Sequence, residues 1–446
     1  MRLMTEGNIT KNLLKFILPM ILGNIFQQLY NITDSIVVGR FVGKNALAAV
    51  GSAFPIMSIA LFLIVGLCIG TSILMAEFFG GGEIEKLKRE ISTTLICGLI
   101  FTIFIAGLFF ALSLPLLKLI KTPSEIIDDC DVYLKIIFCG LIFSFLYNIY
   151  TSALRAVGDS KAPLVFLMVS VVLNIILDLI FVLVLNLGVK GVALATIVSQ
   201  ALSAVFIILY IKIKVPELKL KRNELKIDKK LLKQTINYSW VTASQQTALY
   251  VGKLLVQGAV NPLGVDSIAA FNAVTRVDSF ALAPSDSLNV SITTFTAQNK
   301  GAKQFNRINK GFKESLKMGI YFNLAISLIV YIFAEYFLKV FLNPTDTEAI
   351  IIGTKYLKVM SIFYVGVAFC NVFQGFFRGL GDLKVTLLAT TVNMSIRITL
   401  VYILAPLIGL SSVAVATVCG WACMIALELV FYLKIKRNNF KIEKMH

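Results

Sequence analysis

The stretch LICGLIFTIFIAGLFFALSLPLL, residues 95–117, decides the fold class. It holds no charged side chain and exceeds the ~20 residues that a helix needs to cross a bilayer. Comparable apolar runs recur from Leu13 to Tyr432, and of 446 residues 57% are hydrophobic and only 15% charged. A soluble domain has about 25% charged residues. The sequence therefore predicts an all-α integral protein of the cell (inner) membrane that crosses the bilayer many times.

The apolar runs predict twelve transmembrane helices in two sets of six. These lie near residues 12–38, 46–78, 90–118, 130–153, 162–186, 189–211, 232–259, 267–298, 312–341, 350–377, 384–406 and 411–435. A polar, basic stretch that contains Pro216 separates the two sets. We therefore predict an N-lobe at 1–211, a cytoplasmic linker at 212–231 and a C-lobe at 232–446.

The second half of the sequence repeats the first at an offset of roughly 220 residues, which indicates two related units. The matched pairs include Gln27 with Gln245, Asn148 with Asn371, and Arg155 with Arg378. Because six is an even number of helices, both halves insert in the same orientation and form two pseudo-symmetric lobes. Such repeats are typical of transporters that work by alternating access.

The net charge of +17 comes from basic residues that are dispersed over short loops. Most of the Lys and Arg residues fall in alternate loops and in the linker, so the positive-inside rule predicts that both termini are cytoplasmic. Basic residues that bind nucleic acid gather on one face of a domain, and this pattern excludes that function. The only histidine is His446, which leaves carboxylates to bind ions or protons inside the chain.

Four short motifs carry a resemblance to a known family. They are DSIVVGR at residues 34–40, ALAAVG at 46–51, ALRAVGDSKAP at 153–163 and FRGLGD at 377–382. In this order, and within a six-plus-six repeat, they resemble the multidrug and toxic compound extrusion (MATE) family over essentially the whole chain. The resemblance implies a secondary active antiporter, not an enzyme, that exports bulky organic and typically cationic xenobiotics in exchange for H⁺ or Na⁺. We expect it to act as a monomer in the lipid bilayer, with small organic molecules as partners and no cofactor besides the coupling ion.

Polar side chains on two predicted helices of the N-lobe form a candidate cation site. Asp34 ends a polar face on helix 1, and Asn174 and Asp178 share a face of helix 5 because they are four residues apart. Ionisable groups at membrane depth are costly and therefore mark functional sites. Carboxylate and amide oxygens suit Na⁺, a hard cation, and the same carboxylates can take up a proton. Asn148 and Thr196 complete the oxygen set, and all five residues match the places that the family uses for coupling.

The C-lobe carries fixed charges in place of these carboxylates. By the repeat, Asp34 corresponds to Gly252 and Asn174 to Arg397. We expect a charge network in the C-lobe that either replaces a mobile cation by built-in ones or only holds the fold. Its candidate members are Lys253, Arg276, Asp278, Asp286 and Arg397.

Two further features bear on movement and on turns. Pro19 removes a backbone hydrogen bond within helix 1, so we expect a kink there, which the family resemblance makes a candidate moving part. The segments 155–159 and 378–382, which begin with Arg155 and Arg378 and contain Gly and Asp, are interpreted as short cytoplasmic loops of structural importance.

Three other functions compete with efflux. A lipid-linked oligosaccharide flippase would need a cavity rich in basic residues, which the acidic N-lobe disfavours. A membrane-integral enzyme would need a catalytic His, a metal cluster or an activated nucleophile, and the sequence offers none. A channel would not need duplicated lobes with carboxylates inside the membrane.

Single cysteines placed in a cysteine-free variant test the predicted topology. Residues 212–233 and the C-terminal tail should react only with reagents on the cytoplasmic side, and residues 261–266 only with reagents outside, because the positive-inside rule sets the orientation. Labelling of the linker by an external, impermeant maleimide would reverse the assignment.

Overall fold

The computed structural model describes residues 4–443, apart from the side chains at positions 31, 34, 35, 44 and 438–443. All regular elements in this part are helices. Contacts divide it into two compact units. Unit 1 comprises the described residues up to Gly7, together with 14–244 and 297–304. Unit 2 comprises 8–13, 245–296 and the chain from Phe305 onward.

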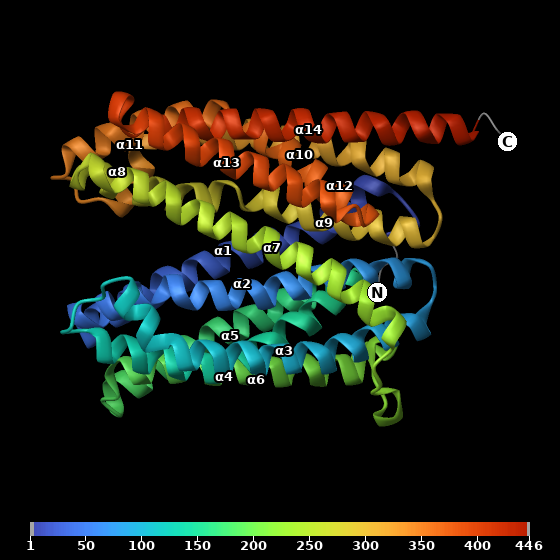
Figure 1. The fold of residues 1–446 in the computed structure, drawn as a ribbon, viewed down its shortest axis with the longest axis horizontal. Coiled ribbons are helices and arrows are strands. Elements are labelled where there is room, and N and C mark those ends of the chain that lie inside the picture. Colours follow the sequence, from blue (N-terminus) through green and yellow to red (C-terminus); the bar gives the residue numbers. More distant parts are fainter. Residues whose placement is uncertain (1–3, 444–446) are drawn as a thin grey trace. The chain divides into compact units, whose positions relative to one another are not determined.

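Unit 1 is built from the first six long helices and the start of a seventh (Figure 1). The elements are α1 (Ile9–Val37), η1 (Val38–Val42), α2 (Lys44–Gly80), α3 (Ile84–Leu119), α4 (Ile127–Ala156), α5 (Lys161–Leu179), η2 (Ile180–Val184), α6 (Gly188–Lys214), η3 (Pro216–Leu218), η4 (Arg222–Glu224) and α7 (Lys229–Val260). Helix α4 packs against α2, α3 and α6, and α5 packs against α6. This arrangement places α4 at the centre of the unit.

Unit 2 holds the rest of α7 and the helices that follow it. They are η5 (Asn261–Leu263), α8 (Val265–Ala281), α9 (Ala283–Gly301), α10 (Phe305–Phe341), α11 (Thr347–Ile362), α12 (Tyr364–Leu380), α13 (Leu383–Ile408) and α14 (Ser411–Glu443). Helix α10 packs against α11 and α12, and α13 packs against α14. Helix α7 belongs to unit 1 up to Ser244 and to unit 2 from Gln245.

Two predicted helices are each observed as a pair. The predicted helix 267–298 is broken at Leu282, where Pro284 enters the first turn of α9 and cannot donate a backbone hydrogen bond. The predicted helix 350–377 is α11 and α12, which meet at Phe363 and differ in direction by 53°. The sequence around Phe363 contains no proline, and we have no physical account of this bend.

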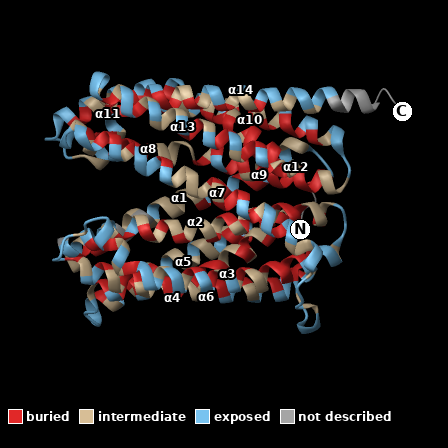
Figure 2. Cartoon of the chain, viewed as in Figure 1, coloured by how far each residue is buried: buried red, intermediate tan, exposed pale blue. Residues whose placement is uncertain are grey.

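The described helices have the surface of a membrane protein. Nine of them are long and apolar enough to span a bilayer, or ten if α11 and α12 form one span. The count of twelve spans therefore remains a prediction. On α3, Ile100 and Phe104 are 62% and 63% exposed, and on α10 Leu328 is 62% exposed. Buried positions line the helices inside each unit, while outer faces carry exposed apolar side chains (Figure 2). Such faces are stable only in lipid.

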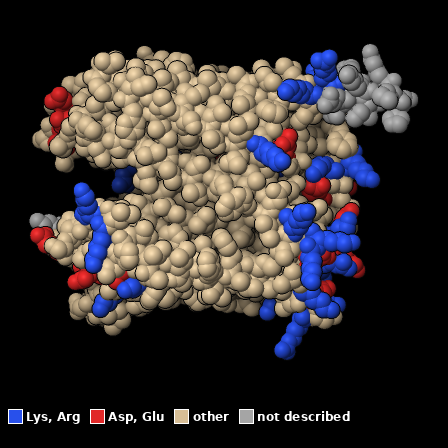
Figure 3. All heavy atoms as spheres, in the orientation of Figure 1, with Lys and Arg blue, Asp and Glu red and all other residues tan. Residues whose placement is uncertain are grey.

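Charged side chains of unit 1 gather at one end. Lys and Arg are concentrated where the linker and the start of α3 lie, and fewer occur at the opposite end of the unit (Figure 3). On the face that Figure 3 shows, the broad surface between the two ends of the unit is almost free of charge. This distribution fits a unit whose middle lies in hydrocarbon.

The first part of α7 is fixed to unit 1 by glycines on α2. A Cβ on Gly66 would lie 2.4 Å from the Cα of Ala243, and one on Gly70 would lie 2.7 Å from the backbone nitrogen of Ser239. The Thr242 hydroxyl donates a hydrogen bond of 2.6 Å to the Gly66 carbonyl. Small residues spaced four apart let membrane helices approach closely, and here they join α2 to α7.

Replacing Gly66 by Ala should destabilise unit 1, because the new methyl group meets backbone atoms that cannot move aside. Overpacking of this kind typically costs about 1–3 kcal/mol. The matched control is Gly51→Ala on the same helix, where a Cβ meets nothing within 4 Å. We expect a lower thermal midpoint in detergent for Gly66→Ala only. Equal midpoints for the two variants would contradict this packing.

Candidate functional site

The structure brings Asn174, Asp178 and Thr196 together inside unit 1. Asn174 is 1% exposed and Asp178 is 0% exposed, both on α5. With its amide nitrogen facing the carboxylate, Asn174 donates a hydrogen bond of 3.1 Å to Asp178 Oδ2. Its amide oxygen then accepts from the backbone N–H of Thr196 on α6 at 3.3 Å. The predicted pair on α5 is therefore tied to the predicted residue on α6.

The other neutral residue of the predicted site is turned toward its own helix. Asn148 on α4 donates a hydrogen bond of 2.8 Å from Nδ2 to the carbonyl of Ser144. The Ser144 hydroxyl in turn donates to Gln200 Oε1 on α6. Thr196 donates its hydroxyl to the Val192 carbonyl at 3.1 Å. These bonds tie α4 to α6 without joining Asn148 to Asp178.

Asp34 lies on α1, and its side chain is outside the described part of the structure. The backbone nevertheless places the end of α1 near that of α5. Shortly after Asp34, α1 continues as the π-helical η1, and shortly after Asp178, α5 continues as the π-helical η2. Elements η1 and η2 contact each other, and η1 also contacts α6. Single π-helical turns in membrane and soluble helices occur frequently at functional sites.

Pro19, which is buried, lies inside α1. The helix is continuous on both sides of it, from Ile9 to Val37. The predicted kink therefore remains a prediction.

Four of the five candidate charges of the C-lobe interact electrostatically but do not form close ion pairs. The charge of Lys253 on α7 interacts with those of Asp286, Arg397 and Asp278. Among the described residues, no ion pair within 4.0 Å joins these groups. Asp278 instead accepts a hydrogen bond from the Tyr364 hydroxyl. Arg276 is exposed on α8.

Asp286 belongs to a different set of contacts from Asp278. Its Oδ1 accepts a hydrogen bond of 3.3 Å from Asn371 Nδ2 on α12. The two acidic residues of the predicted C-lobe network therefore have different hydrogen-bond partners, Tyr364 for Asp278 and Asn371 for Asp286.

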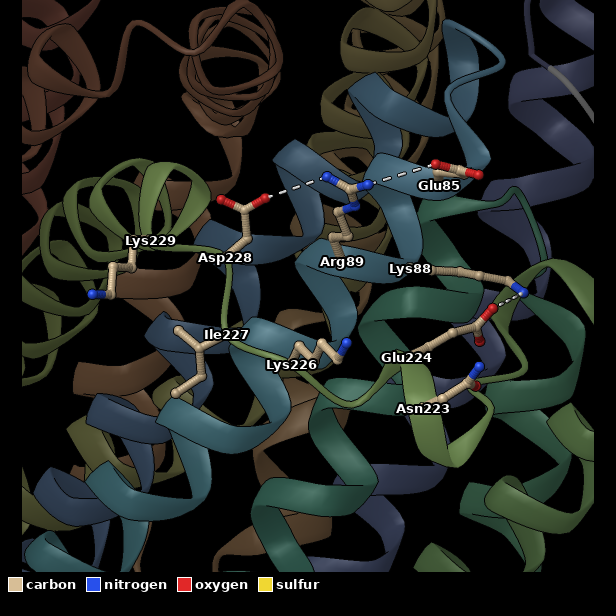
Figure 4. A pocket seen from close by; sticks show the side chains of 9 residues that line it. All are labelled: Glu85, Lys88, Arg89, Asn223, Glu224, Lys226, Ile227, Asp228 and Lys229. Atoms are coloured by element: carbon tan, nitrogen blue, oxygen red, sulfur yellow. Dashed lines mark hydrogen bonds and ion pairs between the residues drawn. The ribbon is translucent and has the colours of Figure 1, made fainter.

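The linker is anchored on the first turns of α3 (Figure 4). Lys88 pairs with Glu224 at 3.3 Å, and Arg89 lies between Glu85 and Asp228 at 3.7 and 3.8 Å. These residues line a pocket of about 550 Å³ together with Asn223, Lys226, Ile227 and Lys229. Because Lys88 and Arg89 of this pocket pair with carboxylates of the same pocket, we interpret the pocket as the place where the linker binds α3.

A buried carboxylate that the sequence analysis did not single out also connects α3 to the chain that follows the linker. Glu90 on α3 is 0% exposed and accepts hydrogen bonds from the hydroxyls of Thr235, at 2.9 and 3.0 Å, and Thr94, at 3.2 Å. Thr235 lies near the start of α7. Thr235 is 145 residues from Glu90 along the chain, so no local spacing in the sequence predicts this contact.

A second missed group lies in unit 2. Arg378 was expected in a loop, but α12 continues through it to Leu380, and the side chain is only 9% exposed. Arg155 likewise lies inside α4. The loop interpretation was wrong for both arginines, because each helix ends only after them. Glu428, which is 0% exposed on α14, could have been found as an ionisable residue within an apolar run.

The donor set around Asp178 suits a small monovalent cation or a proton. Carboxylate oxygens are ligands of the kind that hard cations take, and the same oxygens can accept a proton.

Comparison with known proteins places the chain in a family. A family model described as MatE matches it twice, over residues 19–180 and 242–403. The probable multidrug resistance protein YoeA of Bacillus subtilis (strain 168) is 30% identical over 366 residues, covering 80% of this chain and 78% of that protein. The probable multidrug resistance protein YpnP of the same bacterium is 30% identical over 392 residues, covering 87% and 86%.

A solved structure shares the fold over nearly the whole length. It is an outward-facing conformation of a multidrug resistance MATE family transporter of the MOP superfamily. The TM-score is 0.90 at 22% identity, with 99% of this chain and 98% of that chain covered. The double match of the family model agrees with the internal repeat of the sequence. The chain therefore belongs to the MatE family and is a multi-span membrane transporter, not an enzyme.

Proposed function

We propose that this protein is a secondary active antiporter that exports bulky organic cations in exchange for H⁺ or Na⁺ by alternating access. The observation that carries the proposal is the buried contact of Asp178 with Asn174, which is itself bound to the backbone of Thr196. Ionisable residues this deep in a membrane protein typically mark ion or proton pathways. We assign to this carboxylate the binding of a transported cation or proton for part of the cycle.

The position of the site supports coupling to movement. Asp178 lies just before η2, and η2 contacts η1 at the end of α1. A change of charge at Asp178 would therefore act on the junction between α5 and α1. Binding of the ion and of the substrate must then influence each other equally, since coupling between two sites is reciprocal.

The relatives support organic substrates. YoeA and YpnP are both described as probable multidrug resistance proteins. For this chain we propose planar or bulky organic cations as the exported class and a single chain in the bilayer as the active form. Met and aromatic side chains adapt to varied ligands, which suits a transporter of many compounds.

Removing the charge of Asp178 tests the proposal most directly. Asp178→Asn nearly keeps the shape of the side chain but cannot bind a coupling cation, so ethidium efflux from proteoliposomes under an imposed gradient should fall to background. The same outcome is expected for Asp34→Asn. Asn174→Ala removes a neutral partner of Asp178 but keeps the carboxylate, so it should lower efflux less than Asp178→Asn does.

Each variant is measured with an imposed Na⁺ gradient and, separately, with an imposed pH gradient, which identifies the coupling ion. Asp129→Asn is the matched control, because Asp129 is an exposed carboxylate of the same unit at the start of α4. It should pump like the wild type. Asp178→Asn protein that exports ethidium at the wild-type rate would refute the site.

A further inference from the structure

A buried polar cluster joins five helices of unit 2. We call it the Arg378 cluster, and its members are Gln245, Asn289, Gln374, Arg378, Thr390 and Glu428. They come from α7, α9, α12, α13 and α14. Each is at most 9% exposed. A cluster of this size inside apolar helices is costly unless its members satisfy one another.

Arg378 is the permanent cation at its centre. Nη1 donates to Asn289 Oδ1 at 3.1 Å, and Nη2 donates to Gln245 Oε1 at 3.1 Å. An arginine stays protonated in proteins, so this charge is fixed. The guanidinium is thus held by amide oxygens from two helices, as a bound metal cation would be.

A chain of hydrogen bonds between side-chain amides connects Arg378 to a buried carboxylate. Gln245 donates from Nε2 to Gln374 Oε1 at 2.7 Å and to Thr390 Oγ1 at 2.8 Å. Gln374 donates from Nε2 to Glu428 Oε1 at 2.5 Å. Each amide therefore turns its oxygen toward Arg378 and its nitrogen toward Glu428, which strengthens successive bonds.

A second arm leads to an exposed carboxylate. Asn289 donates from Nδ2 to Asn371 Oδ1 at 3.1 Å, and Asn371 donates to Asp286 Oδ1 at 3.3 Å. Asp286 is exposed, whereas Glu428 is fully buried. One fixed cation is thus connected through amides to two carboxylates.

Glycines on α12 bring the guanidinium within reach of α9. A Cβ on Gly375 would lie 2.5 Å from the carbonyl oxygen of Asn289, and one on Gly379 would lie 2.6 Å from that of Thr293. The two helices are therefore in backbone contact on either side of Arg378.

We propose that Arg378 is a tethered cation: its guanidinium occupies the amide-oxygen site of unit 2 permanently, so that unit 2 takes up no coupling ion, and it positions α7 and α9 on α12 for transport. This rests on the proposed cation-coupled antiport. Unit 2 places the amide oxygens of Asn289 and Gln245 on a guanidinium, whereas unit 1 places the carboxylate of Asp178 beside Asn174. In unit 2 the cation is part of the chain.

The repeat provides a matched control for this assignment. Arg378 corresponds to Arg155, but Gln374 then corresponds to Thr151. Unit 1 therefore has a threonine at the position where unit 2 has Gln374 of the amide relay. A free guanidinium ion should replace the side chain of Arg378 and not that of Arg155.

The experiment is chemical rescue in proteoliposomes. Removing one partner of a buried charge network is strongly destabilising, so Arg378→Ala should lower ethidium efflux by about tenfold or more. Guanidinium chloride below denaturing concentration should restore efflux severalfold in this variant. It should leave the wild type and Arg155→Ala unchanged. Wild-type efflux by Arg378→Ala, or equal rescue of both alanine variants, would overturn the proposal.

A double variant separates positioning from simple charge balance. Arg378→Ala with Glu428→Gln leaves no buried charge in the Arg378 cluster, and such neutral replacements of buried pairs are typically tolerated by the fold. If Arg378 positions the helices, the double variant folds, exports poorly and regains efflux with guanidinium. If Arg378 only balances Glu428, the double variant exports at the wild-type rate without guanidinium, which would refute the positioning role.

Failure of the proposed function has a different signature. A wild-type protein that exports ethidium under neither gradient would refute the antiport alone. The tethered cation would then still be visible as a rise in the thermal midpoint of Arg378→Ala on addition of guanidinium, with no rise for Arg155→Ala. A flat midpoint for both variants would refute the tethered cation itself.

Discussion

The absence of water in the bilayer core is the constraint on which the rest of the structure depends. A polar side chain that enters an apolar unit must find its partners on neighbouring helices. In unit 1 this requirement joins α5 to α6 through Asn174, and in unit 2 it joins α7 to α12 through Gln245 and Gln374. Apolar contacts with lipid are as favourable as those between helices, so these bonds and the close glycine contacts set the packing.

Local spacing in the sequence predicted the part of the candidate site that lies on one helix. Asn174 and Asp178 are one turn apart, so a shared face and a mutual contact follow from helix geometry alone. The partner of Asn174 on α6 is a backbone N–H of Thr196, and no residue type signals such a contact. Asn148 was expected in the same site, yet it bonds a carbonyl of its own helix, which residue type could not reveal.

Arg378 was misplaced for a physical reason. Gly379, Gly381 and Asp382 follow it directly, and glycines near an aspartate usually mark a turn. Only Gly381 takes the left-handed conformation that ends α12, with φ of 84°. Gly379 remains helical and serves close packing against α9. A glycine that ends a helix and one that admits a neighbouring helix look alike in a sequence, because the difference lies in the partner.

The same argument explains how two related halves can do different work. The repeat keeps the arginine and the asparagine of each half, as Arg155 and Asn148 in one and Arg378 and Asn371 in the other. Asn148 bonds its own helix, whereas Asn371 connects Asn289 to Asp286. A duplicated residue keeps its chemistry but takes its role from its neighbours. In our proposals, the amides around Arg378 turn the repeated arginine into a bound cation, while unit 1 keeps the carboxylate of Asp178 beside Asn174 for a mobile one.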